Sequence, residues 1–214
     1  STPKLKIDRH CYEGRTYEDF MRFIADNPDV PVVQMDSVIG NKSGKVLLTM
    51  FFQNSNLLLA FLRDHNTARS VLDVFNDLYA MFGRKTYCRL FPVILTDRGS
   101  EFSNPVPIEQ DENDELRSLV FYCNPSAPYQ KGGIEVAHEL VRRVLPKGKS
   151  FDDLQQEDID LMLSHINSYK RGKLNSRSAY QLFSFIYRDD ILPKLNIHEI
   201  EPNDIVLSPK LLKK

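Results

Sequence analysis

Five short apolar runs, each of strand length and bounded by turn-forming or charged residues, constrain the fold of this chain most strongly. They cover residues 31–39, 45–53, 56–63, 90–96 and 118–123. The glycine-containing segment 40–44 between the first two runs predicts a hairpin. Periodicity alone leaves residues 56–63 open to two interpretations, a third strand or a buried helix. The runs therefore predict a β-sheet that begins with an antiparallel pair.

Helical spacing of apolar residues separates and follows these runs. The predicted helices cover residues 16–27, 67–82, 133–145, 155–169 and 178–187. Thr67 is the expected N-cap of the second helix, and Gly83 is its expected end. Three strands, a helix, two strands and further helices predict a mixed five-stranded sheet with helices packed against it. No glycine-rich phosphate loop follows any strand, which argues against a doubly wound nucleotide-binding fold.

Composition limits the class of protein. Hydrophobic residues make up 42% of the chain, which is sufficient for a core. No apolar run reaches the roughly 18 residues that span a membrane, and no secretion signal opens the chain. The three widely spaced cysteines fit neither a disulfide framework nor a zinc site, so we expect a reduced cytoplasmic protein. The net charge of −1 gives no indication of nucleic-acid binding, so such a function has to rest on local patterns.

Two of the apolar runs are each followed directly by an aspartate, at a position where its carboxylate could bind a ligand. Asp36 follows the run 32–35, and Asp97 follows the run 92–96 immediately before a glycine turn. Ligands commonly bind beyond strand ends in sheets of this kind. The alternatives are a solvent-facing strand end for Asp36 and, for Asp97, a turn-capping role or an ion pair with Arg98.

Glu135 places a third carboxylate on the predicted helix 133–145, directly after the Gly132-Gly133 pair. At about 100° per residue, one side of this helix is expected to be apolar and the other polar. The apolar side would contain Val136, Ala137, Leu140, Val141 and Val144, and the polar side Glu135, His138, Glu139 and Arg142. An ordinary solvated face is the alternative. Glu135 and His138 also have the spacing of di-iron carboxylate bundles, but the sequence contains no second copy.

Brought together, the three carboxylates would form an oxygen-rich site for two Mg²⁺ ions, the machinery of phosphoryl transfer on nucleic acid. Basic residues flank the Glu135 helix: Lys131, Arg142, Arg143, Lys147 and Lys149. The loop 124–132 adds an aromatic and an amide side chain, a mixture that suits a phosphate backbone and unstacked bases. Solvated helix faces are the alternative. The acidic segment 109–115 lacks the spacing of a calcium loop, and we expect a solvated surface loop there.

These motifs resemble DDE transposases of the insertion-sequence-thirty family. Residues 33–40 are similar to the family's first-acid motif and residues 96–102 to its second. The third-acid motif corresponds to residues 122–125, 130–135 and 146–148, together with His138 and Arg142. The family's closing element corresponds to Asn167 and residues 174–182. The resemblance runs from about residue 14 to the end of the chain, and its motifs agree in order, spacing and flanks.

The resemblance implies an α/β, ribonuclease H-like fold with a helical C-terminal extension. It divides the chain into an N-terminal segment (1–28), an integrase-type catalytic core (29–170) and an extension with a tail (171–214). Asp36, Asp97 and Glu135 would be the catalytic ligands of two Mg²⁺ ions, for which Mn²⁺ can substitute. Lys131, His138, Arg142, Arg143 and Lys147 would contact DNA.

The implied function is metal-dependent cleavage and strand transfer at transposon ends. The expected partners are transposon-end and target DNA and further copies of the chain, without a membrane or a small-molecule substrate. The expected location is the bacterial cytoplasm, associated with the nucleoid. The family's helix-turn-helix region does not appear in this sequence, so recognition of the transposon end is expected to lie outside it.

The sequence departs from the family pattern at a few positions. The family usually has an acid where Gln34 stands and Thr-Pro where Ser178-Ala179 stand. None of these changes removes a predicted metal ligand. They leave open a non-catalytic or repurposed DNA-binding or scaffold module on the same fold. A ribonuclease H-like nuclease without strand transfer is a further alternative, because it would use the same metal chemistry.

Overall fold

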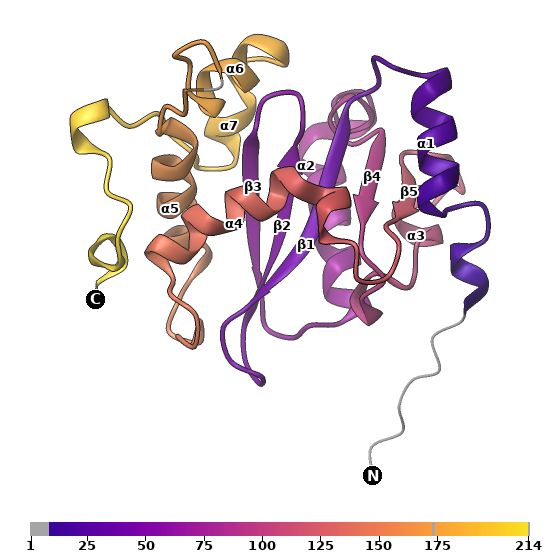
Figure 1. Cartoon of the computed structure of the whole chain (residues 1–214), viewed down its shortest axis with the longest axis horizontal. Helices are drawn as coiled ribbons and strands as arrows, with labels where there is room; N and C mark the ends of the chain where they lie inside the picture. Colours follow the sequence, from indigo (N-terminus) through magenta and orange to yellow (C-terminus); the bar gives the residue numbers. More distant parts are fainter. Residues whose placement is uncertain (1–8, 173, 214) are drawn as a thin grey trace. The chain divides into compact units, whose positions relative to one another are not determined.

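The structure, a computed structural model, describes residues 9–172 and 174–213, and Figure 1 labels its helices and strands. The chain divides into two compact units. The first unit comprises residues 1–32 and 66–131, and the second comprises residues 33–65 and 132–214. Each unit is therefore built from two stretches of chain that are separated in sequence.

The second unit contains three antiparallel strands, β1 (Val32–Ile39, of which residue 32 is assigned to the first unit), β2 (Val46–Phe52) and β3 (Leu57–Arg63). Every residue of β2 is buried, because this strand lies between the other two and carries apolar side chains on both faces. The register pairs Asp36 of β1 with Thr49 of β2. The predicted hairpin is confirmed, and residues 57–63 form a strand and not a helix.

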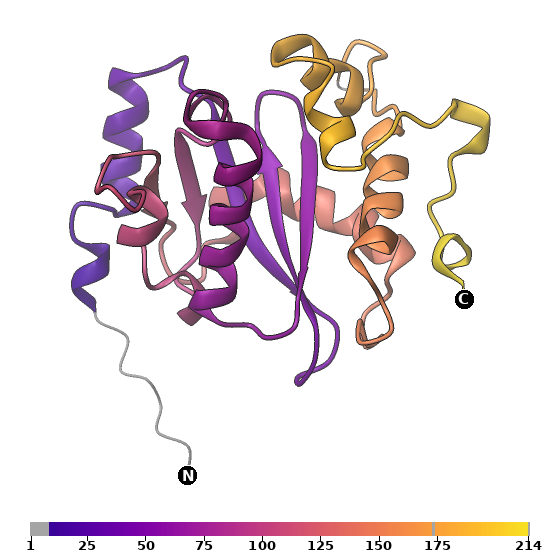
Figure 2. The ribbon, with the colours of Figure 1, turned by 180° about the vertical axis from the view of Figure 1, so that it is seen from behind.

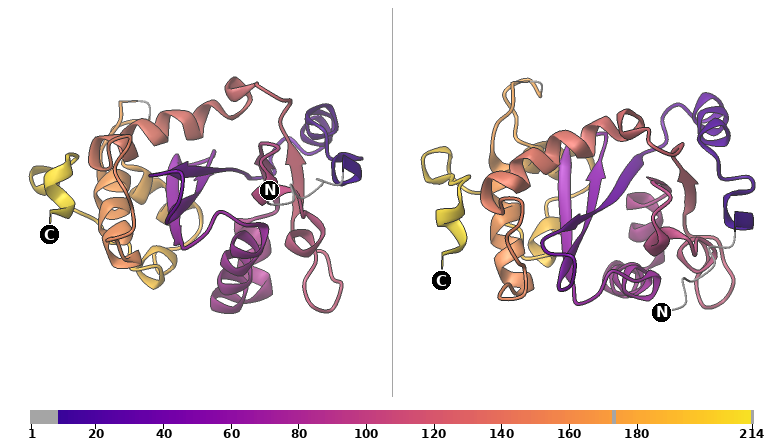
Figure 3. Two further views of the ribbon diagram at one scale, coloured as in Figure 1. Left: turned by 90° about the horizontal axis from the view of Figure 1, so that it is seen from below. Right: turned by 60° about the horizontal axis from the view of Figure 1, so that its bottom comes forward.

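Helix α5 (Gln156–Ser168) packs along the outer strand β3, as Figures 1 and 3 show. Gln156 accepts a hydrogen bond from Leu62 N at 2.8 Å and donates one to Ala60 O at 3.0 Å. Asn167 accepts from Leu58 N at 2.9 Å and donates to Leu58 O at 2.8 Å. The open backbone groups of an edge strand are a template for pairing with another chain. Here the side-chain amides of Gln156 and Asn167 form hydrogen bonds with backbone groups of this edge strand.

The first unit contains two parallel strands, β4 (Val93–Thr96) and β5 (Leu119–Tyr122). Helix α1 (Tyr17–Asp26) begins at a capping box in which the Thr16 and Asp19 side chains accept each other's backbone N–H groups. Phe20 of α1 packs in a core with Val93 and Phe121 of the two strands.

Helix α2 (Ala68–Leu90), the purple helix facing the viewer in Figure 2, differs from the prediction. Thr67 caps it as expected, but Gly83 does not end it. Gly83 adopts φ 75° and ψ 165°, which breaks the helical path, and helical turns resume and continue to Leu90. The strand predicted from residue 90 therefore starts only at Val93.

Within the acidic segment 109–115, residues 112–115 form the exposed loop that their composition predicts, whereas Glu109 differs. Glu109 closes the short helix α3 (Val106–Glu109) and is buried. Its Oε1 lies 2.5 Å from Arg15 Nη2, and its Oε2 accepts from Val120 N at 3.0 Å. The pairing cation makes burial of this carboxylate tolerable, so the residue ties the N-terminal segment to β5.

The remaining elements are all helices, of which α4 and α6 are the longest and the others have a single turn. They are η1 (Arg9–Tyr12), η2 (Ser100–Phe102), η3 (Pro128–Lys131), α4 (Gly132–Val144), α6 (Ala179–Ile186), α7 (Ile191–Lys194), η4 (Pro202–Asp204) and η5 (Pro209–Leu212). The helical character predicted for the C-terminal extension is confirmed by α6 and α7.

The five strands form a mixed sheet, and strands and helices follow one another in the predicted order. The predicted α/β class is confirmed, and it agrees with the ribonuclease H-like fold that the resemblance implied. The domain boundaries after residues 28 and 170 stay a prediction. Across the described residues, no helix combines the length and the apolar character needed to cross a membrane.

Candidate active site

Asp36 occupies the middle of β1 in the second unit and is partly exposed. Its Oδ1 accepts a hydrogen bond from the backbone N–H of Ser37 at 2.8 Å, which orients the carboxylate relative to its own strand. Thr49 lies opposite, on β2, and its hydroxyl donates to the Asp36 carbonyl oxygen at 3.1 Å.

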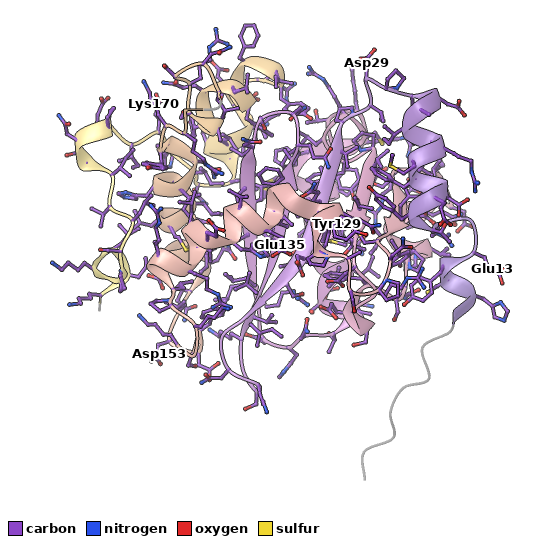
Figure 4. The ribbon with its side chains drawn as sticks, in the orientation of Figure 1. Glu13, Asp29, Tyr129, Glu135, Asp153 and Lys170 are labelled. Carbon is purple, nitrogen blue, oxygen red and sulfur yellow. The ribbon has the colours of Figure 1, made fainter. Side chains whose placement is uncertain are left out.

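Glu135 projects from the first turn of α4 and is exposed; Figure 4 labels it. The start of this helix is tied to β1, because the buried Gln34 side chain accepts from Ile134 N at 2.8 Å. The first N–H groups of a helix lack partners within the helix, and this amide satisfies one of them. Gln34 thus has a structural use at a position where the resembling family usually carries an acid.

Gly133 allows α4 to approach the sheet of the second unit. A Cβ atom at this position would lie 2.3 Å from Cε1 of Phe51 on β2. The buried face of the helix is Ile134, Ala137, Leu140, Val141 and Val144. Val136 was predicted to lie on this face and does not: it is 49% exposed, and Ile134 takes its place. The helix begins one residue earlier than its predicted start, at Gly132.

His138 lies one turn after Glu135 and contacts β2. Its Nε2 lies 2.8 Å from Thr49 Oγ1. We assign the single Thr49 hydroxyl proton to the Asp36 carbonyl, which makes Nε2–H of His138 the donor of the hydrogen bond between His138 and Thr49. In the neutral ring, Nδ1 is then the acceptor nitrogen.

A groove of about 610 Å³ runs along this part of the second unit. It is lined by Ser37, Val38, Glu135, His138, Glu139, Arg142, Arg143 and Lys147. Four of the five predicted DNA-contacting residues therefore surround one groove together with Glu135. Arg142 also has a structural contact, because its Nη2 donates to Ile39 O at 3.0 Å, and burial lowers the pKa of its guanidinium.

Asp97 lies in the first unit, one residue beyond the end of β4. Its Oδ1 accepts from Gly99 N at 2.8 Å, so Asp97 makes the turn-capping contact that was one of the alternatives for this residue. Its Oδ2 lies 3.5 Å from Lys131 Nζ. Arg98 does not supply that cation: its Nε donates to Cys123 O at 3.3 Å, and its guanidinium lies 4.5 Å from the centre of the Tyr12 ring.

Lys131, predicted as a DNA contact, points into the protein. It is 2% exposed and closes the η3 turn, immediately before α4. The Gln130 side chain of the same turn accepts from Asn124 N at 2.8 Å. Tyr129 is instead displayed to solvent at 78% exposure and is labelled in Figure 4.

The donors available for a metal are hard oxygen ligands. Asp36, Asp97 and Glu135 are carboxylates with at least partial exposure, the type of ligand that Mg²⁺ prefers. Between residues 9 and 213, residue 173 aside, no group of three or more His, Cys, Asp or Glu side chains is arranged to hold a metal ion. The donor chemistry fits Mg²⁺, while the convergence of the three carboxylates on shared ions stays a prediction.

Thr49 is the site residue that the sequence did not reveal. It sits inside the apolar run Val46–Phe52 and has no motif of its own. The strand register that places it opposite Asp36 is the signal that identifies it.

Comparison with known proteins agrees with the motif resemblance. No protein-family model matches the chain. The chain is 29% identical over 151 residues to a putative integrase, ORF3, of Spiroplasma virus SpV1-R8A2 B, covering 71% of this chain and 45% of the relative. It is 27% identical over 63 residues to the transposase InsI for insertion sequence element IS30A of Escherichia coli, covering 29% of this chain and 16% of the relative. The similarity to insertion-sequence-thirty transposases and to integrases is therefore confirmed.

The chain spans less than half the length of these relatives. Among solved structures, the catalytic core domain of BIV integrase matches with a TM-score of 0.46 at 20% identity, covering 76% of this chain and 97% of that chain.

Proposed function

We propose that this chain is the catalytic core of a DNA transposase that cleaves and joins DNA strands at transposon ends. The similarity to a putative integrase and to an IS30A transposase supports this function. The order and spacing of the three acidic motifs also support it. The proposed substrates are transposon-end and target DNA, and the proposed active form is an oligomer of this chain on DNA in the bacterial cytoplasm.

The groove of the second unit carries this proposal. It combines one candidate catalytic carboxylate, Glu135, with the cations of Arg142, Arg143 and Lys147. Cations beside a carboxylate suit a phosphodiester that has to be held close to an acidic site. This local concentration of basic residues also explains how a chain of net charge −1 can bind DNA.

We propose that Asp36, Asp97 and Glu135 hold the divalent ions. Bound Mg²⁺ would supply activation of the attacking hydroxyl and stabilisation of the leaving oxygen. The protein's own part is placement. Arg143 and Lys147 are exposed in the groove and are proposed to bind phosphates, whereas Arg142 shapes the groove through its contact with Ile39. No side-chain nucleophile is required.

The proposal is tested by substituting Asp97. We expect Asp97→Asn to abolish cleavage and joining of labelled transposon-end DNA in Mg²⁺, because the substitution removes one ligand charge and leaves the fold intact. Asp29→Asn, at an exposed position before β1, is the matched control and should keep full activity. Wild-type activity in Asp97→Asn would refute the assignment. Cleavage without joining by the wild-type protein would instead identify a nuclease of the same fold.

A further inference from the structure

We infer that Thr49 and His138 are positioning residues that fix the Asp36 strand relative to the Glu135 helix. The inference rests on the proposed function, since it concerns how two of the proposed metal ligands are held. All four residues belong to the second unit.

Thr49 is the one polar residue in β2. Its neighbours along the strand are all apolar, and Thr49 itself is fully buried. Valine has the same shape and would fill the site without a hydroxyl to satisfy. Burying a hydroxyl is costly unless it is hydrogen bonded, so packing alone does not explain the residue. The hydroxyl is explained by its two partners, the Asp36 carbonyl and His138 Nε2.

The hydrogen bonds run in one direction, from α4 to β2 to β1. His138 Nε2–H donates to Thr49 Oγ1 at 2.8 Å, and the Thr49 hydroxyl donates to Asp36 O at 3.1 Å. The first link starts one helical turn after Glu135, and the second ends on the residue that carries the Asp36 carboxylate. The Asp36 carboxylate is then oriented by its Ser37 N contact.

A second connection holds the same two elements together. Gln34 on β1 accepts from Ile134 N at the start of α4. Asp36 lies two residues after Gln34, and Glu135 lies directly after Ile134. Two hydrogen-bonded links therefore flank the pair of carboxylates. The buried apolar face of α4 packs the helix in place, and the two links add directional contacts on either side of Glu135.

The experiment compares conservative and disruptive substitutions by Mn²⁺ affinity, measured by electron paramagnetic resonance without DNA. Substitutions in the hydrogen-bonding partners of metal ligands typically cost about 10–100-fold in metal affinity or activity. We expect a loss of that size for Thr49→Val and for His138→Leu. Thr49→Ser keeps the hydroxyl, and His138→Gln keeps an N–H donor. The Mn²⁺ affinity of both variants should stay within about threefold of the wild-type affinity, a smaller loss than the roughly 10–100-fold expected for the disruptive substitutions.

The double variant Thr49→Val with His138→Leu should lose no more Mn²⁺ affinity than the more affected single variant. Both substitutions break the same hydrogen-bonded link from His138 through Thr49 to Asp36, so their effects should not add.

Nitrogen-15 NMR of the His138 ring provides a readout that does not depend on metal or on activity. We expect the wild-type ring as the Nε2–H form at neutral pH and a shift toward a mixture of tautomers in Thr49→Val. Folded Thr49→Val and His138→Leu proteins with wild-type Mn²⁺ affinity would overturn the inference, as would an Nδ1–H ring. If Thr49→Val does not fold, the Mn²⁺ affinities of His138→Leu and His138→Gln are compared instead, since His138 is only half-buried. Equal affinities in these two variants would then overturn the inference. If the NMR result is as expected but the wild-type protein neither binds Mn²⁺ nor cuts DNA, the proposed function fails while the hydrogen-bonded link stands.

Discussion

At the scale of single residues, the buried lysine beside Asp97 separates two roles that look alike in a sequence. A lysine near a candidate catalytic acid can bind a DNA phosphate or can hold the acid in place. Lys131 is buried and lies 3.5 Å from Asp97, whereas Lys147 is exposed and lines the groove of the second unit. We therefore expect a positioning role for Lys131 and phosphate binding for Lys147.

The two roles predict opposite results for the salt dependence of DNA binding. We expect Lys147→Met to reduce the slope of log K against log salt by about 0.9, since each phosphate contact releases counterions. Lys131→Met should leave this slope unchanged and lower strand cleavage by at least about tenfold, the size typical of lost support for a metal ligand. Fluorescence anisotropy between low and moderate salt measures the slope. A reduced slope in Lys131→Met would return this residue to the DNA contacts.

Some residues of the candidate site could be predicted from the sequence because their signal is local. Asp36, Asp97 and Glu135 stand next to apolar runs and turns, and the family motifs around them make them candidates, while their role as metal ligands stays a prediction. The direction of Lys131 and the role of Thr49 are not local properties. They depend on which side chains a turn buries and on strand register, and both are set by packing between distant segments. Val136 was misplaced for a similar reason, since helix α4 presents Ile134 to the sheet instead.

At the scale of elements, the amide contacts between α5 and β3 make a strong prediction about stability. Asn167 is fully buried and satisfies both backbone groups of Leu58. Asn167→Leu would leave a buried donor and a buried acceptor without these partners, at about 1–3 kcal/mol each. We expect the free energy of unfolding in urea to fall by about 2–6 kcal/mol. The exposed control Asn203→Leu should change it by less than about 0.5 kcal/mol. A similar small change in Asn167→Leu would show that the contacts are dispensable.

The segment after α7 is attached to α5 through a histidine, which makes its attachment sensitive to pH. His165 Nδ1 accepts from Val206 N at 3.0 Å, and burial lowers the pKa of the ring. A protonated ring cannot accept this hydrogen bond. The contribution to stability is thus complete above the ordinary histidine pKa of about 6.5 and is lost as pH falls from there through the lowered folded-state pKa.

We expect the wild-type protein to lose stability more steeply than His165→Asn as pH falls below about 6.5, because the asparagine side-chain oxygen can accept without titrating. Thermal unfolding at matched ionic strength measures the difference. Parallel pH profiles for the two proteins would contradict the role given to His165.

The η3 turn presents an aromatic ring outward while its other polar side chains are engaged. Base stacking on an exposed aromatic contributes about 1–3 kcal/mol per base. We expect Tyr129→Ala to weaken binding of DNA ends with unpaired terminal bases by about 5–150-fold, and Tyr129→Phe to bind like the wild type. Quenching of 2-aminopurine at the end position reports stacking directly. Equal quenching with Tyr129→Ala would exclude this contact.

Element boundaries were predicted well where a cap or an apolar period marks them and poorly where tertiary contacts decide. Thr16, Thr67 and Ser178 each cap a helix as local chemistry requires. Gly83 was predicted to end α2, but helical turns resume because residues such as Tyr87 and Leu90 bury apolar surface beyond it. The acidic composition of residues 109–115 likewise concealed the ion pair between Glu109 and Arg15, whose partners are 94 residues apart.

At the scale of the whole molecule, the order of strands and helices followed from the sequence, while the division into units did not. Each unit combines an early and a later stretch of chain. Which stretches fold together depends on long-range contacts that no local pattern encodes. The net charge of −1 is compatible with the cluster of Arg142, Arg143 and Lys147 in the groove, since net charge does not report how charges are distributed over a surface.

The α5 contacts with β3 also have a consequence for the order of events during synthesis. Leu58 and Asn167 are 109 residues apart. At elongation rates of about 5–20 residues per second, Leu58 of β3 is synthesised roughly 5–20 s before Asn167. During that interval the apolar strand has an unprotected edge, so the nascent chain is open to self-association and to capture by chaperones. The mature protein no longer carries that vulnerability, because its own later helix closes the edge.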